Sequence, residues 1–263
     1  LFLHGYPQTH MIWHKVAPEL SRHYTVVLTD LRGYGDSSKP KSDINHTVYS
    51  KREMALDQVE VMQDLGFKKF SVVGHDRGAR VAHRILIDHK NFIKKAVVMD
   101  IVPTLTMYEE TNRDFAYNYY HWFFLTQPFD FPEKLIGMDP KYYLQKKIKS
   151  WGKNKGFITQ EAFKEYLRCF SNPETIHASC EDYRASNTID LQHDKYDYGT
   201  KTDVPLLVLW GSDAFVGSHY NVLDVWKKYA NNVKGQSLPG GHYIPEEAPK
   251  ETIKVLMDFL SEK

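Results

Sequence analysis

The stretch that decides the fold is Phe70-Ser71-Val72-Val73-Gly74-His75-Asp76-Arg77-Gly78-Ala79-Arg80. A short apolar run, typical of a buried strand, leads into a Gly-x-Asp-x-Gly turn. A sharp strand-to-helix turn of this kind lifts its central side chain above the edge of a sheet. That side chain is Asp76, and a carboxylate there is suited to nucleophilic attack, including displacement at an sp³ carbon that bears a leaving group. We therefore predict that Asp76 is a catalytic nucleophile.

Strand-like and helical stretches alternate on both sides of this turn. The predicted strands are Thr25–Thr29, Phe70–Val73, Ala96–Met99 and Leu206–Trp210. The predicted helices are Val48–Leu65, Gly78–His89, Val222–Tyr229 and Lys250–Glu262. This alternation indicates an α/β fold with a mostly parallel sheet flanked by helices, in which ligands bind beyond the carboxyl ends of the strands. Leu1-Phe2-Leu3 is typical of the end of a strand, so we expect further N-terminal strands to be missing from this chain.

Residues 103–196 differ in composition and in sequence pattern from the rest of the chain. They are rich in aromatic residues and lysine and poor in strand patterns. Because they lie between two predicted core strands, we interpret them as a helical cap inserted between core residues 1–102 and 197–263. The alternative is an ordinary run of surface helices.

A base and an acid are needed beside the nucleophile, and they are expected in the order nucleophile, acid, histidine. His242 lies in a glycine-flanked loop near the C-terminus and is the predicted base. Two acids are candidates: Asp213 follows one predicted strand, and Asp100 follows another. Asp213 stands one residue earlier than the usual position, so we favour Asp100 as the group that orients His242 and stabilises its imidazolium.

Two arginines follow the nucleophile on the same predicted helix. Arg77 and Arg80 are three residues apart and therefore share a face near Asp76. Guanidinium groups bind carboxylates through paired hydrogen bonds, so the two indicate an anionic substrate. Their charges are also expected to lower the pKa of Asp76 and keep it ionised.

Composition narrows the class of protein. The chain has 34 Lys and Arg against 33 Asp and Glu, a formal net charge of +1, which indicates neither a nucleic-acid nor a membrane partner. Cys169 and Cys180 lack metal-ligand spacing and are typical of the thiols of a cytoplasmic protein. No apolar run approaches transmembrane length. We expect no metal and no other cofactor.

These motifs together resemble those of the haloacetate (fluoroacetate) dehalogenases of the α/β-hydrolase superfamily. The resemblance covers nearly the whole chain. Its most specific part is Asp76-Arg77-Gly78-Ala79-Arg80 combined with His121-Trp122. The other matching stretches are His4-Gly5-Tyr6-Pro7-Gln8-Thr9, Asp30-Leu31-Arg32-Gly33-Tyr34-Gly35-Asp36-Ser37, Asp100-Ile101-Val102-Pro103-Thr104, Glu181-Asp182-Tyr183-Arg184-Ala185 and the loop around His242.

The resemblance implies a two-step mechanism. Asp76 attacks the α-carbon of a haloacetate and expels halide, and His242, oriented by Asp100, activates water that hydrolyses the resulting ester to glycolate. The resemblance further implies a carboxylate clamp of Arg77 and Arg80, a halide pocket of His121, Trp122 and Tyr183, a cavity lined by Tyr6 and Trp151, and a homodimer. From the residues alone, the aromatic cluster in residues 103–196 is more typical of a hydrophobic core.

Three other functions fit parts of the sequence. An epoxide hydrolase shares the aspartate nucleophile and would protonate its substrate with two cap tyrosines, Tyr183 with Tyr119 or Tyr120. A neutral epoxide needs no arginine clamp, however, and the same argument disfavours a haloalkane dehalogenase. A non-catalytic small-molecule-binding protein of the same fold is disfavoured because nucleophile, acid and base are all present.

Overall fold

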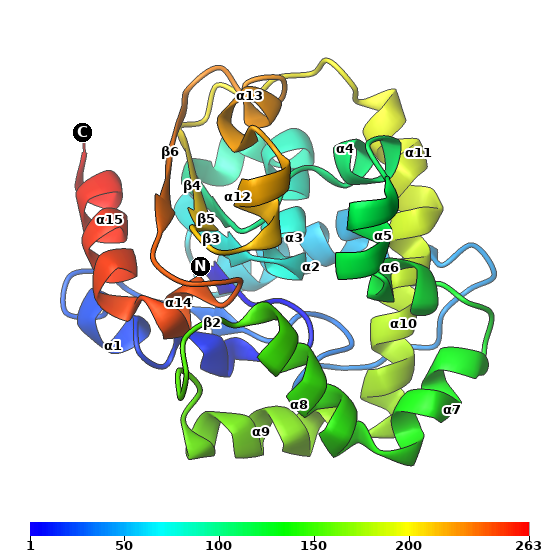
Figure 1. The fold of residues 1–263 in the computed structure, drawn as a ribbon. Helices are drawn as coiled ribbons and strands as arrows, with labels where there is room; N and C mark the ends of the chain where they lie inside the picture. Colours follow the sequence, from blue (N-terminus) through cyan, green and yellow to red (C-terminus); the bar gives the residue numbers. More distant parts are fainter. Residues whose placement is uncertain (263) are drawn as a thin grey trace.

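The computed structural model describes residues 1–262, which fold around a six-stranded parallel sheet (Figure 1). The strand order is β2-β1-β3-β4-β5-β6, and every neighbouring pair is parallel. The strands are β1 (Phe2–Leu3), β2 (Leu28–Thr29), β3 (Phe70–His75), β4 (Ile93–Met99), β5 (Leu206–Gly211) and β6 (Val233–Leu238). The predicted fold class is therefore confirmed.

The four predicted strands are all present, but their lengths differ and one strand was not predicted. β2 begins at Leu28 rather than Thr25, whereas β3 and β4 are longer than predicted. The strand that sequence patterns missed is β6, which pairs only with β5 at the edge of the sheet. Its residues are mostly exposed or half-buried, so they lack the apolar run that marks a central strand.

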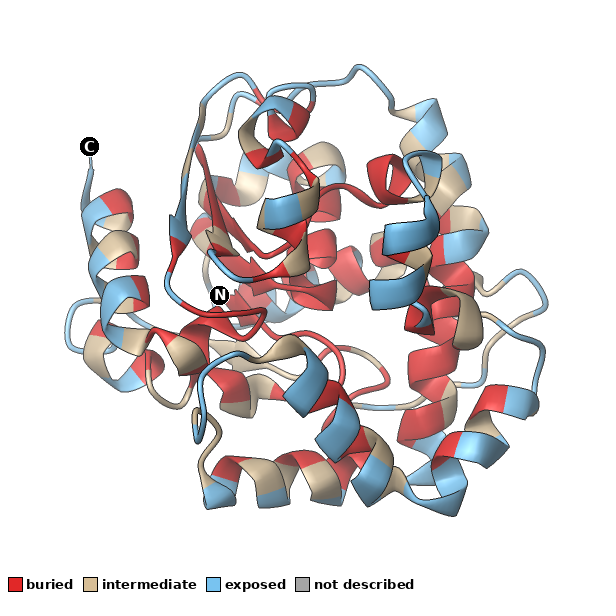
Figure 2. Ribbon diagram, in the orientation of Figure 1, coloured by how far each residue is buried: buried red, intermediate tan, exposed pale blue. Residues whose placement is uncertain are grey.

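Helices cover both faces of the sheet. Neighbouring strand residues point to opposite faces, so Val72 packs in one apolar cluster and Val73 in another. The first cluster includes side chains of α2 (Lys51–Asp64) and α3 (Arg77–Asp88). The second includes side chains of α1 (Ala17–Leu20) and α15 (Pro249–Ser261). Figure 2 shows that β3, β4, β5 and α3 form the most deeply buried layer.

The four predicted helices correspond to α2, α3, α13 (Val222–Trp226) and α15. Of these, α13 ends three residues earlier than predicted. Two further short helices, α12 (Phe215–His219) and α14 (Ile244–Glu247), follow β5 and β6. Among residues 1–262, no helix is long and apolar enough to cross a membrane.

The chain between β4 and β5 is helical and forms the right and lower parts of the molecule in Figure 1. Its helices are α4 (Thr104–Glu109), α5 (Arg113–Asn118), α6 (His121–Phe124), α7 (Phe131–Met138), α8 (Pro140–Trp151), α9 (Gln160–Phe170), α10 (Pro173–Asn187) and α11 (Ile189–Tyr196). Hydrogen bonds join this segment to the loops that follow β1 and β6, through Tyr143 and Trp151. The segment therefore packs against the loops that carry the site residues.

The strand order places a crevice beside β3. In the sheet, β1 lies between β2 and β3. The chain runs from β1 to β2 on one side of β1 and then crosses to β3 on its other side. The loops that leave β1 and β3 therefore diverge at their carboxyl ends, and a crevice of this kind is where α/β sheets bind ligands. The Asp76 turn follows β3 at this point.

Candidate active site

Asp76 occupies a strained backbone position between β3 and α3. Its φ is 48° and its ψ −115°, a conformation that non-glycine residues rarely adopt. The two glycines of the turn permit this close packing: a Cβ on Gly74 would lie 2.5 Å from the Gly78 carbonyl oxygen, and a Cβ on Gly78 would lie 2.3 Å from the His4 carbonyl oxygen. The Gly-x-Asp-x-Gly pattern is thus a steric requirement of the turn.

The loop after β1 holds one oxygen of the Asp76 carboxylate. The Tyr6 backbone N–H donates a 2.7 Å hydrogen bond to Asp76 Oδ1. The other oxygen, Oδ2, lies 3.8 Å from His242 Nε2. A Cβ on Gly5 would come within 2.4 Å of the Asp76 Cβ, so only glycine lets this loop approach so closely. The two oxygens therefore have different surroundings.

His242 is held from three directions. Its Nδ1–H donates a 2.6 Å hydrogen bond to Asp100 Oδ2, and the Gly211 N–H donates to Asp100 Oδ1 at 3.1 Å. The His242 backbone is fixed by its N–H bond to the Trp151 carbonyl at 3.0 Å and by a 2.7 Å bond from His75 Nε2 to its own carbonyl. Nε2 has no hydrogen-bond partner among the described residues and faces Asp76.

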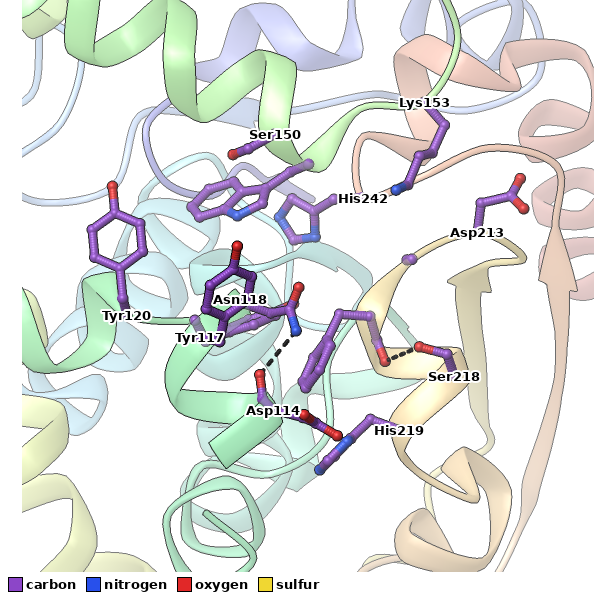
Figure 3. A pocket seen from close by; sticks show the side chains of 14 residues that line it. Asp114, Tyr117, Asn118, Tyr120, Ser150, Lys153, Asp213, Ser218, His219 and His242 are labelled. Atoms are coloured by element: carbon purple, nitrogen blue, oxygen red, sulfur yellow. Dashed lines mark hydrogen bonds between the residues drawn. The ribbon is translucent and has the colours of Figure 1, made fainter. Parts of the chain in front are cut away.

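Asp213, the other candidate acid, lies apart from this group. It is exposed, its carboxylate accepts a hydrogen bond from the Ser212 hydroxyl, and in Figure 3 it points away from His242. Asp100, in contrast, is 1% exposed. The structure therefore brings Asp100, and not Asp213, to His242.

The surroundings of the site lower the pKa of Asp76 and raise that of His242. Burial alone would raise the pKa of Asp76, but His242, His75 and the two arginines together hold it below its usual value. Burial opposes the charge of His242, yet its bond to Asp100 and the charges of Asp100 and Asp76 raise its pKa. Such an arrangement can stabilise an imidazolium between two carboxylates.

Arg77 is largely occupied by an acid of the helical segment. Its Nε and Nη2 donate to the Asp182 carboxylate at 2.8 and 2.6 Å, and Nη2 also donates to the Ser186 hydroxyl at 2.5 Å. Asp182, fully buried, also pairs with Lys51 and accepts from the Tyr34 hydroxyl at 2.7 Å. One nitrogen of Arg77, Nη1, is buried without a partner among residues 1–262.

Arg80 keeps a different nitrogen free. Its Nη1 donates to the Val102 carbonyl and to the Thr104 hydroxyl, each at 3.0 Å. Its Nε is buried and, within the described chain, has no partner. Each of the two arginines therefore retains one N–H donor that a bound anion could use, and both donors lie on the helix that begins at Asp76.

The predicted halide and cavity residues form one buried aromatic cluster. The His121 ring centroid lies 5.5 Å from that of Tyr183 and 4.6 Å from that of Trp151. Trp122 lies 6.1 Å from Tyr183, and Tyr6 lies 5.4 Å from it. The arginines complete the cluster, because the guanidinium carbons of Arg77 and Arg80 lie 4.2 Å from the Tyr183 ring and 4.7 Å from the Trp122 ring, respectively.

Two polar atoms of this cluster have no protein partner. His121 Nδ1 and the Tyr183 hydroxyl are both buried and unpaired within residues 1–262. Burial and the neighbouring positive charges keep the pKa of His121 well below its usual value, and burial raises that of Tyr183. Both side chains are therefore neutral near pH 7, and each has a polar group that it can offer to a ligand.

A cavity of about 680 Å³ adjoins the site at His242, whose side chain is one of those that line it (Figure 3). Trp151 and His242 are among the residues that line it, so the base stands between the cavity and Asp76. Lys153, also on its wall, brings positive charge to the mouth. Residues 1–262 hold no group of three or more His, Cys, Asp or Glu side chains placed to bind a metal ion.

The structure adds contacts in the site that sequence reasoning did not predict. Asp182 anchors Arg77, His75 fixes the His242 backbone, and the Tyr6 N–H binds Asp76. The Asp182–Arg77 pair joins residues 105 positions apart, so no local pattern reveals it. The Tyr6 donor is a backbone group, and a sequence carries no signal for it.

Comparisons with known proteins agree with this geometry. The profile of the α/β hydrolase fold matches residues 1–249. The fluoroacetate dehalogenase of Burkholderia sp. is 44% identical over all of this chain and 86% of its own length. The soluble epoxide hydrolase of Corynebacterium sp. (strain C12) is 31% identical over 99% of this chain and 89% of its own.

Among solved structures, a provisionally named α/β hydrolase from Nostoc sp. PCC 7120 superposes with a TM-score of 0.99. The two sequences are 56% identical, and the match covers all of this chain and 90% of the Nostoc protein's chain. The resemblance that the sequence motifs indicated is thereby confirmed. The chain belongs to the α/β hydrolase family.

Proposed function

We propose that this hydrolase removes halide from haloacetates, converting fluoroacetate or chloroacetate to glycolate. The observation that carries the proposal is the position of an ionised Asp76 between a histidine–aspartate pair and two arginines that each keep a free N–H donor. A small α-halo acid has one group for each part: a carboxylate for the arginines and an electrophilic carbon for Asp76. The 44% identity to a fluoroacetate dehalogenase supports the assignment.

The first step forms an ester on the protein. Because the Tyr6 N–H occupies Oδ1 of Asp76, Oδ2 is the oxygen free to attack the α-carbon. A carbon–oxygen bond forms as the carbon–halogen bond breaks, and the halide leaves with the bonding electron pair. The unpaired polar groups of His121 and Tyr183 can receive it, together with Trp122. Removing one preorganised donor from such a site typically costs about 3 kcal/mol of transition-state stabilisation.

The second step hydrolyses the ester. His242 Nε2 takes a proton from water, and the hydroxide attacks the ester carbon of Asp76 while Asp100 stabilises the imidazolium. The Tyr6 N–H on Oδ1 is placed to stabilise the negative charge that develops there. Glycolate leaves as Asp76 is regenerated, so haloacetate and water yield glycolate, halide and one proton.

Halide release tests the proposal directly. The protein is incubated with fluoro-, chloro- and bromoacetate, and halide and glycolate are measured together; the Asp76→Asn variant is the control. We expect equimolar products from at least one substrate and none from the variant. No release from any haloacetate, accompanied by turnover of styrene oxide, would contradict the proposal.

A trapped intermediate tests the mechanism. Without His242 the ester cannot be hydrolysed, so the His242→Ala variant should gain the mass of a carboxymethyl group on Asp76 after incubation with chloroacetate, as seen by intact mass spectrometry. The variants of the two candidate acids should differ in activity: Asp100→Ala should lose turnover, whereas Asp213→Ala should keep it. A folded His242→Ala protein of unchanged mass would rule out the covalent step.

Epoxide hydrolysis is the second candidate. The 31% identity to a soluble epoxide hydrolase and the free, buried Tyr183 hydroxyl both favour it, because that hydroxyl could protonate an epoxide oxygen. The arginine donors have no role with a neutral epoxide. The assay above distinguishes the two, because an epoxide hydrolase would turn over styrene oxide and release no halide from the haloacetates.

A further inference from the structure

Lys147, on α8, is a buried cation with no carboxylate partner. It is 2% exposed, and none of its contacts within residues 1–262 is a salt bridge. Its ammonium instead lies 3.7 Å from the ring centroid of Tyr120, 5.0 Å from that of Trp151 and 5.8 Å from that of Tyr143. Aromatic faces offset only part of the cost of burying a charge, so a lysine in this position is expensive for the fold.

The aromatic cage of Lys147 shares its walls with the proposed halide pocket. The Trp151 ring that contacts Lys147 also lies 4.6 Å from the His121 ring. Tyr143, on the other side, accepts a 3.0 Å hydrogen bond from the Tyr6 hydroxyl. The positive charge of Lys147 adds to burial in lowering the pKa of His121.

Among residues 1–262, the side chains around Lys147 carry no negative charge near neutral pH that would cancel the charge of its protonated form. The pKa values of the surrounding tyrosines are raised by burial, and that of His121 is lowered, so all of these side chains are uncharged. The ionisable groups that face Lys147, directly or across its cage, are Tyr6, Tyr120, His121, Tyr143, Tyr183 and, on the other side of the Trp151 ring, His242. In its protonated form, Lys147 can therefore act on whatever anion the pocket holds.

We propose that Lys147 is a specificity-determining positioning residue whose ammonium, acting through the aromatic wall, favours the departure of the halide that concentrates charge most, fluoride. The inference rests on the proposed dehalogenase function. It differs from a direct halide donor, because Lys147 is separated from the pocket by the rings of Trp151 and Tyr120. Charge on the leaving group is greatest where the carbon–halogen bond is hardest to break, so the effect should rank fluoride over chloride over bromide.

Leaving-group dependence provides the main test. The Lys147→Met variant keeps the length and apolar stem of the side chain and removes its charge, and Lys147→Arg restores a charge. With Lys147→Met we expect kcat to fall about 10-fold for fluoroacetate but less than about 3-fold for bromoacetate, a size typical of one unit charge at this range in a partly screened interior. Lys147→Arg should recover most of the fluoroacetate rate.

The neighbouring lysine is a matched control. Lys146 stands on the same helix but is exposed, with its ammonium 5.2 Å from the Tyr142 ring, so Lys146→Met should leave all three rates unchanged. Relieving a buried charge should also leave the thermal midpoint of Lys147→Met unchanged or higher. Equal losses with all three substrates, a lower midpoint, or no recovery in Lys147→Arg would overturn the inference.

A second measurement separates this inference from the proposed function. Burial lowers the pKa of Lys147 to about 7, so an anion bound nearby should draw a proton onto it. Acetate is titrated calorimetrically at pH 8 in two buffers of different ionisation enthalpy. The wild type should take up a fraction of a proton, and Lys147→Met should take up measurably less. Equal proton uptake by the two proteins, or no acetate binding to the wild type, would contradict the proposed role of Lys147. Either result holds whether or not the protein reacts with haloacetates.

Discussion

At the scale of single residues, the site depends on two aspartates in unusual backbone conformations. Asp76 and Asp100 follow neighbouring strands, β3 and β4, and both have positive φ angles of 48° and 53°. Non-glycine residues rarely adopt positive φ angles, so these conformations cost free energy. In return, the turned backbone points both carboxylates at His242. The strain thus lies at the residues to which we assign the chemistry.

Arg80 should contribute mainly to substrate binding. Its free Nε is available for the substrate carboxylate, and a hydrogen bond between charged groups contributes about 1.5–3 kcal/mol. Arg80→Leu should therefore raise KM for chloroacetate by about 10- to 100-fold, with a smaller change in kcat. Steady-state kinetics of the purified variant provide the measurement.

The control for this variant is Arg84→Leu. Arg84 lies one turn further along α3 and pairs with Asp88 and Asp197, away from the site. The Arg84→Leu variant should therefore be less stable than the wild type but have the same KM for chloroacetate. If Arg80→Leu left KM unchanged, Arg80 would have no place in the carboxylate clamp.

Sequence reasoning identified side chains that carry a local signal. The glycines around Asp76 and His242 mark tight turns, and so both residues could be named from the pattern alone. The buried partners could not, because the acid that anchors Arg77 and the cage around Lys147 come from distant parts of the chain. Only the fold decides which charges meet.

At the scale of elements, the central strands have a local sequence signal, whereas the edge strand depends on a contact with a distant part of the chain. β3, β4 and β5 lie inside the sheet and are buried on both faces, so their apolar runs are visible in the sequence. β6 pairs on one side only, and its alternation is dominated by exposed residues. An edge strand of this kind gains its structure from pairing with β5, which a linear pattern does not show.

The helix α10 is buried along most of its length and so lacks the sequence pattern of a surface helix. Asp182 and Tyr183 both stand on it, and nearly all of its central residues are buried. A helix covered on all sides has no polar stripe, so its sequence lacks the amphipathic period of a surface helix. Its polar residues gave no hint that they bind Arg77 and Tyr34 rather than water.

At the scale of the whole molecule, buried polar contacts join the helical segment to the core. Asp182 links α10 to α2 and α3 through Lys51 and Arg77. On the opposite side, Glu246 of α14 accepts hydrogen bonds from Gln8 at 2.6 Å and from Tyr166 of α9 at 3.0 Å. The site thus lies between two groups of buried polar contacts, one around Asp182 and one around Glu246. The stability of the protein should depend on the protonation of these two carboxyl groups.

Glu246 should make the protein less stable as pH rises. It is 1% exposed, and burial, only partly opposed by its hydrogen bonds, raises its pKa from 4.5 to about 8. Between these pH values the folded state holds a proton that the unfolded state has released, so the free energy of unfolding must fall with pH, by up to about 1.4 kcal/mol per unit. Above about pH 8 both states are ionised and this dependence ends.

The Glu246→Gln variant isolates this contribution, because subtracting its unfolding free energy from that of the wild type cancels other titrating groups such as His242 and Lys147. Urea unfolding between pH 5 and 9 should show the wild type losing stability relative to the variant up to about pH 8 and running parallel to it above. Glu251→Gln, at an exposed position on α15, should track the wild type throughout. A constant difference between wild type and Glu246→Gln would mean that Glu246 is ionised in the folded protein, and that Gln8 and Tyr166 hold it as a carboxylate.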